Sequence, residues 1–123
     1  MLHTNFQNWL DGIIASETPD ETIVGYYFGI FKDEVHYTVY LTGSEVYDPL
    51  DADWACRSDF EPADKYFIFP GEFDSWNWQE ILDEIEKFLN NFVRSDLYLN
   101  SFFSTAKIIA TGFDDGDLVE ICK

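Results

Sequence analysis

Two consecutive stretches decide the fold, TIVGYYFGIF at residues 22–31 and VHYTVYLT at residues 35–42. The first carries apolar side chains at both alternating positions, which is typical of a strand buried on both faces. The second alternates between apolar residues and His36, Thr38, Tyr40 and Thr42, which indicates a strand with one buried face. Because only residues 32–34 separate the two stretches, the sequence predicts a β-hairpin that ends at Gly43.

One amphipathic helix is predicted before this hairpin in the chain, and a second one after it. Residues 6–14 carry apolar side chains at helical spacing on Phe6, Trp9, Leu10, Ile13 and Ile14. The stronger helix covers residues 77–94, where Asn77 and Glu80 match a capping box. Its apolar face, which we expect to be buried, consists of Trp78, Ile81, Leu82, Ile85, Phe88, Leu89 and Phe92. Both apolar stripes therefore predict helices that pack on the sheet.

The remaining segments complete a single domain over residues 1–123. Residues 66–69 read as a short aromatic strand, and within the ambiguous residues 96–105 a short helix or irregular turn is expected around residues 100–104. The end of the chain reads as a second hairpin, residues 107–113 and 118–122, in which Asp115-Gly116 favours a two-residue type I′ turn. The sum predicts an α+β fold, an antiparallel sheet of about five strands with an N-terminal helix and a long later helix packed on it.

The charge balance excludes several classes of partner. Seven Lys and Arg face 24 Asp and Glu, which gives a formal charge of −17, while apolar residues make up 46% of the chain. Such a composition folds, but it lacks the cations that bind nucleic acid or an anionic membrane. No apolar stretch reaches the length of a membrane span. We therefore expect a basic protein partner, with no direct nucleic-acid or membrane binding.

The N-terminus and the cysteines bear on the compartment. The first residues have neither a basic segment nor an apolar segment of the kind that forms a secretory signal. Cys56 and Cys122 lie far apart without a CxxC motif, and we expect both to be reduced thiols. A disulfide between them has no support from the pattern. These features predict a cytoplasmic protein.

Ser44–Asp64 is the first candidate for a functional segment. It has no sustained period and carries seven acidic residues against one basic residue, Arg57. A loop of this length in a small domain is often functional. It also contains Tyr47, Trp54 and Phe60, which either anchor the loop on the domain or act as hot spots of an interface. A second, smaller acidic cluster lies at residues 114–117.

Motifs for catalysis or metal binding are absent from the sequence. The loop fails the EF-hand pattern in both registers tested, because no glycine or glutamate falls where calcium binding needs one. The serines lie in no GxSxG motif, and His3 and His36 lack the spacing of zinc ligands. Cys56 reads as a small buried apolar residue. We expect no enzyme activity, no cofactor and no metal.

Two further motifs carry a resemblance to a known class. The stretch Asp53-Trp54-Ala55-Cys56 with Phe60-Glu61-Pro62, and the ending at residues 111–119, resemble motifs of small acidic bacterial proteins. Those proteins are the immunity proteins of polymorphic toxin and contact-dependent inhibition systems. The resemblance implies a cytosolic protein without catalysis that binds and neutralises a cognate toxin domain.

The sequence thus predicts an immunity-type protein that binds a basic toxin domain through an acidic surface. The predicted partner-binding residues are Asp48, Asp51, Asp53, Trp54, Asp59, Glu61, Asp64, Asp114, Asp115 and Asp117. Two alternatives stay open, a nucleic-acid mimic that inhibits DNA-binding proteins and a small-ligand domain or enzyme with an aromatic-lined pocket. The oligomeric state also stays open.

Overall fold

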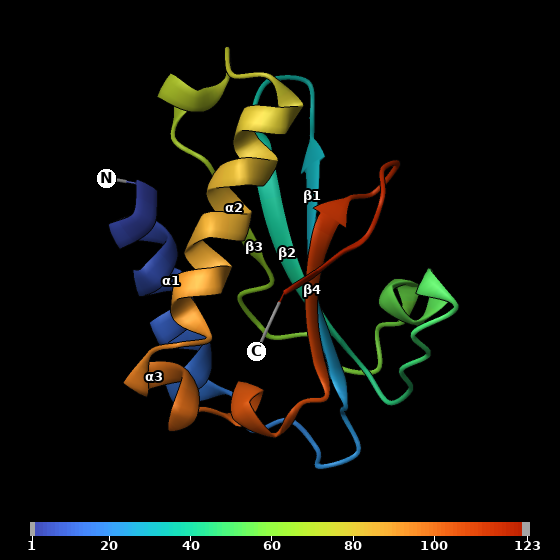
Figure 1. The fold of residues 1–123 in the computed structure, drawn as a ribbon. Coiled ribbons are helices and arrows are strands. Elements are labelled where there is room, and N and C mark those ends of the chain that lie inside the picture. The colour runs from blue at the N-terminus through green and yellow to red at the C-terminus, as the bar shows by residue number, and fades with distance from the viewer. Residues whose placement is uncertain (1, 122–123) are drawn as a thin grey trace.

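The computed structural model describes residues 2–121, and its α+β architecture confirms the predicted fold class. The regular elements are, in order, α1 (Leu2–Ser16), β1 (Gly25–Lys32), β2 (Tyr37–Ser44), β3 (Tyr66–Ile68), α2 (Trp78–Phe92), α3 (Asp96–Leu99), β4 (Ile108–Phe113) and β5 (Val119–Ile121). Short 3₁₀ turns occupy Ala52–Cys56, Gly71–Phe73 and Phe102–Thr105. Figure 1 shows the helices gathered on one side of the sheet and the Ala52–Cys56 turn on the other.

The sheet is mixed, which corrects the prediction of a purely antiparallel sheet. Its five strands run in the order β3-β2-β1-β4-β5. β1 pairs antiparallel with β2, as the predicted hairpin requires, but parallel with β4, from Gly25 opposite Ile108 to Ile30 opposite Phe113. The long connection through α2 brings β4 beside β1 in the same direction, as a helical crossover does. This central position explains why β1 is apolar at both alternating positions.

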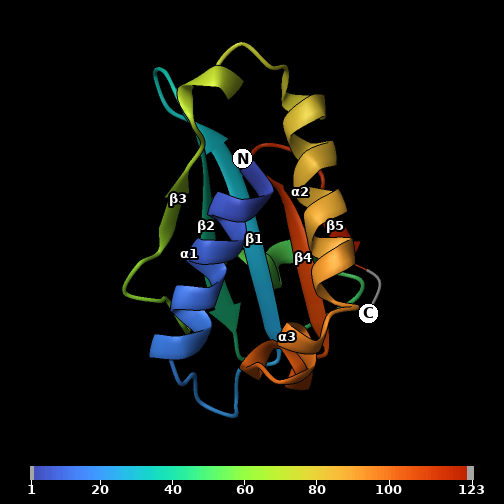
Figure 2. The ribbon, with the colours of Figure 1, turned by 90° about the vertical axis from the view of Figure 1, so that its left-hand side faces the viewer.

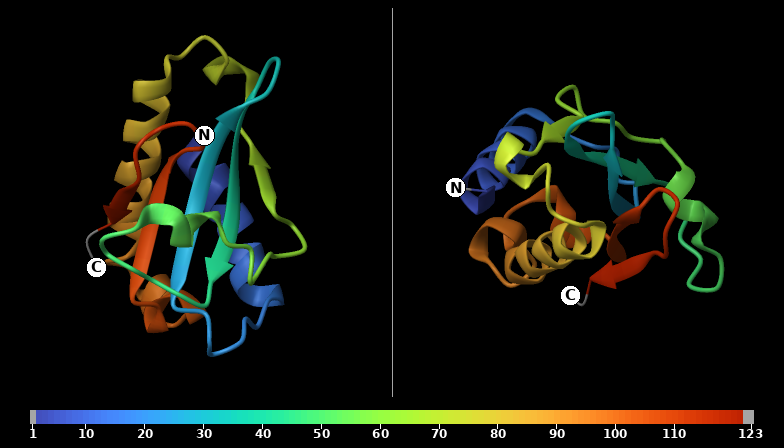
Figure 3. Two further views of the ribbon diagram at one scale, coloured as in Figure 1. Left: turned by 90° about the vertical axis from the view of Figure 1, so that its right-hand side faces the viewer. Right: turned by 90° about the horizontal axis from the view of Figure 1, so that it is seen from above.

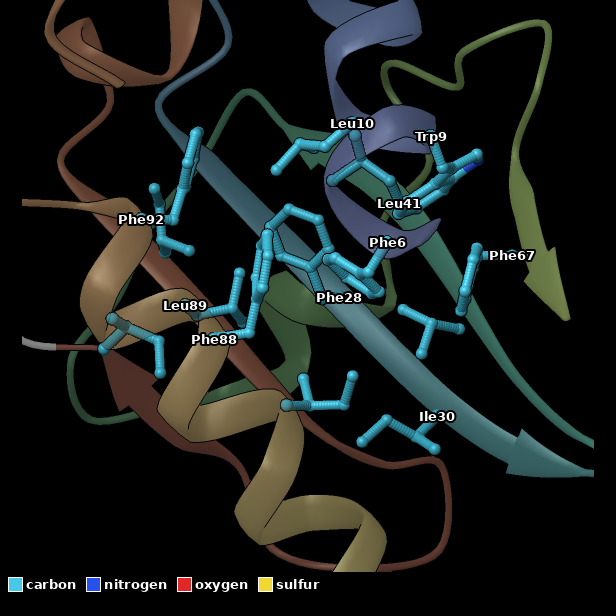
Figure 4. Packing of buried hydrophobic residues seen from close by; sticks show 14 of the residues in the cluster. Phe6, Trp9, Leu10, Phe28, Ile30, Leu41, Phe67, Phe88, Leu89 and Phe92 are labelled. Carbon is cyan, nitrogen blue, oxygen red and sulfur yellow. The ribbon is translucent and has the colours of Figure 1, made fainter. Parts of the chain in front are cut away.

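The main core lies between the sheet and the helices α1 and α2, which cover one face side by side (Figure 2). Phe6 of α1 lies at its centre, with ring centroids 4.5 Å from Phe88 of α2 and 5.2 Å from Phe67. Figure 4 shows Phe6, Phe28 and Phe88 converging from α1, β1 and α2. The apolar stripes of both predicted helices therefore meet on the sheet.

The N-terminal end of α2 both confirms and corrects the prediction. The capping box is present, since the Asn77 side chain accepts from the Glu80 amide and the Glu80 carboxylate accepts from the Asn77 amide. Trp78, however, is 58% exposed instead of buried. It is the first residue of α2, and the buried stripe begins only one turn later, at Ile81. Trp76 packs on the core instead, with its ring centroid 4.7 Å from that of Phe73.

The turn between β4 and β5 differs from the predicted type I′ turn. That turn needs Asp115 at positive φ, and no non-glycine residue among those described has one. Instead, Gly116 donates its amide to the carbonyl of Phe113 at 2.9 Å. The glycine that the hairpin requires is Gly112, where a Cβ would lie 2.6 Å from the carbonyl oxygen of Asp117. The strands therefore stop pairing early, and residues 114–117 project as a longer loop.

A candidate acidic interface

Trp54 fixes the acidic loop, Ser44–Asp64, on the sheet face opposite the helices. Its side chain is only 3% exposed and packs in a second cluster with Tyr27, Ile108 and Ala110. Gly25 makes room for it, since a Cβ there would lie 2.7 Å from the Trp54 ring. Trp54 is therefore an anchor of the loop and not an exposed hot spot, which removes it from the predicted partner-binding residues.

The structure brings the acidic loop next to the second acidic segment, the acidic turn Asp114–Asp117. Tyr47 of the loop donates its hydroxyl to Glu120 at 2.9 Å, and Leu118 packs against the Trp54 cluster. Loop and turn lean to the same side of the sheet (Figure 1), and Figure 3 shows the loop crossing in front of the strands when viewed from that side. The two segments that the sequence singled out separately thus form one surface, which we call the acidic face.

Several carboxylates of the acidic loop also shape its backbone. Asp48 accepts from the amide of Leu50 at 2.9 Å, and Asp51 accepts from the amide of Asp53 at 3.0 Å at the start of the 3₁₀ turn. Asp64 acts through its backbone, since its carbonyl accepts from the Trp9 indole at 2.9 Å. Side chains that make such turns hold their own backbone while they remain exposed. Their carboxylates are therefore fixed in place and face solvent.

Two of the predicted acidic residues are already paired within the chain. Asp59 binds Arg57 at 2.7 Å, and this guanidinium, together with the Glu45 amide, holds the pKa of Asp59 below its usual value. Glu61 binds Lys65 at 2.5 Å, which likewise lowers the pKa of Glu61. Within residues 2–121 no salt bridge involves Asp48, Asp51, Asp53, Asp115 or Asp117. These five exposed carboxylates leave an uncompensated negative charge on the acidic face.

The acidic turn separates two hollows that share Phe31 and Asp114. The loop-side hollow, about 300 Å³, lies between the turn and the acidic loop and also includes Tyr40 and Tyr66. The helix-side hollow, about 1040 Å³, lies between the turn and α2. Its lining includes the buried Tyr37 and Leu82, the partly buried Phe113, the exposed Trp78 and the carboxylate of Glu86. Apolar surface is thus available on both sides of a negatively charged turn.

Tyr40 links the sheet to the acidic turn. Its hydroxyl donates to Asp114 Oδ1 at 2.5 Å. Burial raises the pKa of Tyr40, and the hydrogen bond to Asp114 raises it further. The phenol therefore stays protonated and keeps donating to the carboxylate throughout the neutral range.

Sequence reasoning missed Trp78, Tyr40 and Lys65 as parts of this surface. Tyr40 belongs to the polar set of alternating positions in its strand, and this indicates that its ring lies outside the main core. The exposure of Trp78 depends on where along α2 the contact with the sheet begins, and the spacing of apolar residues does not give that position. Lys65 comes directly after the acidic loop and had no motif to mark it.

The remaining candidates for chemistry are scattered. Cys56 carries an exposed free thiol, which corrects its prediction as a buried residue, and Cys122 lies outside the described residues. His3 contacts Glu84 and His36 contacts Asp74, each at 2.9 Å, at separate places. Among residues 2–121, no three His, Cys, Asp or Glu side chains are arranged to hold a metal ion.

Comparisons of the chain with protein-family models, with curated proteins and with solved structures found no match. Among the described residues, no helix is long and apolar enough to cross a membrane. The acidic face is therefore interpreted from its own geometry and charge.

Proposed function

We propose that this protein is a cytoplasmic, non-catalytic immunity-type protein that binds a basic toxin domain and neutralises it through the acidic face. The observation that carries the proposal is the joining of the acidic loop and the acidic turn on one side of the sheet, with unpaired carboxylates around two hollows. Clustered charge of one sign accelerates encounter with a partner of the opposite sign. The resemblance of residues 53–56 and 111–119 to immunity proteins points to the same class.

The acidic face also offers the apolar contacts that a stable complex needs. A standard interface buries about 800 Å² per partner and takes most of its binding energy from a few central residues, Trp among them. Trp78 is 58% exposed beside the helix-side hollow, with its ring centroid 6.2 Å from that of Phe113. We assign Trp78 to the part of the interface on the helix side of the acidic turn, as its exposed aromatic contact in place of the buried Trp54.

The proposal assigns no catalytic residue, cofactor or metal to the chain. It treats the carboxylates as contacts for lysine and arginine side chains, since close charge pairs couple strongly when water is excluded from them. Nucleic-acid mimicry enters only as an outcome of the test below, because it requires carboxylates spaced like phosphates along an elongated face, and the acids of the acidic loop are interspersed with aromatic residues.

The test is affinity capture from a lysate of the source cells, followed by reconstitution. The tagged protein is washed at low salt and eluted with a salt gradient, and the eluted proteins are identified by mass spectrometry. We expect one basic protein, retained in a fixed ratio, whose purified toxic activity is abolished when this protein is added.

A broad set of unrelated basic proteins, released together at modest salt and displaced by DNA, would contradict the proposal and favour nucleic-acid mimicry. A captured protein whose activity is unchanged in the complex would also contradict it. A rise in melting temperature with a metabolite, in the absence of any protein partner, would favour the small-ligand alternative.

A further inference from the structure

A cation already lines the loop-side hollow, the ammonium group of Lys65. The Lys65 Nζ atom lies 5.6 Å from the ring centroid of Tyr40 and 5.4 Å from that of Tyr66. Both distances lie within the range at which a cation is attracted to an aromatic face. The Lys65 side chain is only 24% exposed, although it belongs to a surface segment. The protein thus buries most of its own lysine against aromatic rings.

Three aromatic rings form the wall of this hollow. The ring centroid of Phe31 lies 6.1 Å from that of Tyr40 and 6.4 Å from that of Tyr66, and those of Tyr40 and Tyr66 are 6.5 Å apart. The Phe31 and Tyr66 rings are perpendicular to each other, and the Tyr40 ring is inclined to both. Rings at such angles around one space form the kind of aromatic cage that binds organic cations.

Asp114 adds a carboxylate to the same space. Its Oδ1 atom accepts from the Tyr40 hydroxyl at 2.5 Å, and among residues 2–121 no salt bridge occupies it. A phenol that donates to a carboxylate is polarised, which makes its ring a better partner for a cation. The hollow therefore combines aromatic faces with a carboxylate that has no cation of its own.

We propose that the loop-side hollow is a binding site for a basic side chain of the partner protein, and that Lys65 takes the cation position over the Tyr40 and Tyr66 rings in the free protein as an internal substitute. The inference rests on the proposed function for the source of the side chain, but the site itself can be tested without the toxin. On binding, the partner's cation takes the place of Lys65 over the Tyr40 and Tyr66 rings and pairs with Asp114, which Lys65 leaves without a salt bridge. No covalent step is involved.

Displacement of Lys65 is energetically feasible. Its ion-pair partner is Glu61, four residues earlier on the same exposed segment, so lysine and glutamate can swing outward together. Glu61 is 46% exposed, so water and salt screen the pair from that side and limit its contribution to stability. A partner cation gains more than Lys65 does, because it can form an ion pair with Asp114, to which Lys65 makes no salt bridge.

The test uses Lys65→Met, which keeps the apolar stem and removes the competing charge. Ethylguanidinium chloride is titrated into the ¹⁵N-labelled protein, with sodium chloride at equal ionic strength as the control for plain screening. We expect saturable amide shifts at Tyr40, Tyr66 and Asp114 in the variant, with affinity about threefold or more above the wild type, the scale of an exposed cation–π contact. Lys65→Gln, which also lacks the charge, is measured alongside in case the methionine variant does not fold.

Two further variants make the test specific. Lys107→Met makes the same change in net charge at an exposed residue outside the hollow, and we expect no gain in affinity there. Lys65→Met combined with Asp114→Asn keeps a hydrogen-bond acceptor for Tyr40 but removes the carboxylate charge, and we expect the gain to be lost. Shifts that do not saturate, that match sodium chloride, or that strengthen equally in Lys107→Met would overturn the inference.

The inference and the proposed function can fail separately. If toxin binding is found but ethylguanidinium does not saturate the hollow, the function stands and this site is wrong. If ethylguanidinium binds as expected but no toxin is neutralised, the cation site stands and the proposed function fails.

Discussion

Tyr40 of β2 and Asp114, the residue directly after β4, are joined by a hydrogen bond of 2.5 Å that reaches across the central strand β1. The bare backbone of Gly29 makes this reach possible, because Tyr40 pairs with Gly29 in β1, which lies between β2 and β4. A Cβ on Gly29 would lie 2.1 Å from the Tyr40 ring. The acidic turn is therefore tied to the sheet through a side chain that needs a glycine beneath it.

We predict that Gly29→Ala destabilises the protein by about 1–3 kcal/mol, the usual effect of overpacking a tight site. Tyr40 must leave its place to make room, so the hydrogen bond to Asp114 is lost as well. Urea unfolding measures the change. Gly12→Ala is the matched control, since a Cβ there meets nothing within 4 Å in the middle of α1. It should be stabilising by up to about 1 kcal/mol, and equal effects at both sites would contradict the account.

Trp54→Ala is predicted to lower the free energy of unfolding by about 3–5 kcal/mol, because a fully buried indole is removed. Trp54→Phe should be much milder. Among residues 2–121 the indole N–H of Trp54 has no hydrogen-bond partner, so phenylalanine removes no bond. Amide hydrogen exchange in residues 45–60 should rise in the alanine variant before global unfolding. Unchanged exchange in that segment would show that Trp54 does not anchor the loop.

Trp78→Ala should behave in the opposite way. Its side chain is 58% exposed, so we expect stability to change by no more than about 0.5 kcal/mol. If Trp78 contacts the toxin on the helix side of the acidic turn, the same substitution should weaken toxin binding by about 2 kcal/mol or more. Calorimetry of the purified pair gives this value. A full-strength complex with Trp78→Ala would place the interface elsewhere.

The ion pair between Arg57 and Asp59 makes a defined prediction about pH. Arg57 lowers the pKa of Asp59, so the pair stabilises the fold above the usual carboxyl pKa of about 4 and loses this effect as the pH falls through the lower value. Arg57→Gln should therefore differ most from the wild type near neutral pH and converge with it in acid. Lys107→Gln makes the same charge change at a residue that forms no salt bridge within the described part of the chain, and it corrects for the net charge. A difference that grows as the pH falls would have the wrong sign.

The elements that could be predicted from sequence are those set by local pattern. The stripe of residues 81–92 depends only on neighbours in the chain, and its helix forms where expected. The strand predicted over residues 35–42 also forms, but at Tyr37–Ser44, and both of its faces are covered, so the prediction of one buried face is wrong. The parallel pairing of β1 with β4 depends on the path of the connection between them, which no local pattern encodes. The sheet was therefore predicted in its strands but not in all their directions.

The acidic face shows a similar division. Both acidic segments were visible as composition, but their meeting depends on Tyr47 reaching Glu120 and on Leu118 joining the Trp54 cluster. From the sequence, the aromatic residues of the loop could be either anchors on the domain or hot spots of an interface. Trp54 is an anchor, because its ring fits into the space that Gly25 leaves by having no Cβ. Trp78 was assigned to the core because periodicity places a residue on a face of the helix but does not say where the neighbouring layer ends.

The central claim is that the acidic face binds the toxin, and charge reversal at Asp51 and Asp53 tests it most directly. The affinity of the Asp51→Lys, Asp53→Lys double variant is compared with that of Asp20→Lys, Glu21→Lys. The control makes the same charge change in the loop between α1 and β1, at the end of the sheet opposite the acidic turn (Figure 1). It is also matched in structure, since Asp20, like Asp51, accepts a hydrogen bond from the backbone amide two residues later. The account predicts that the first variant loses at least about tenfold in affinity, with a weaker salt dependence, while the control binds nearly as well as the wild type. Equal affinities for the two variants, with the same salt dependence, would contradict it.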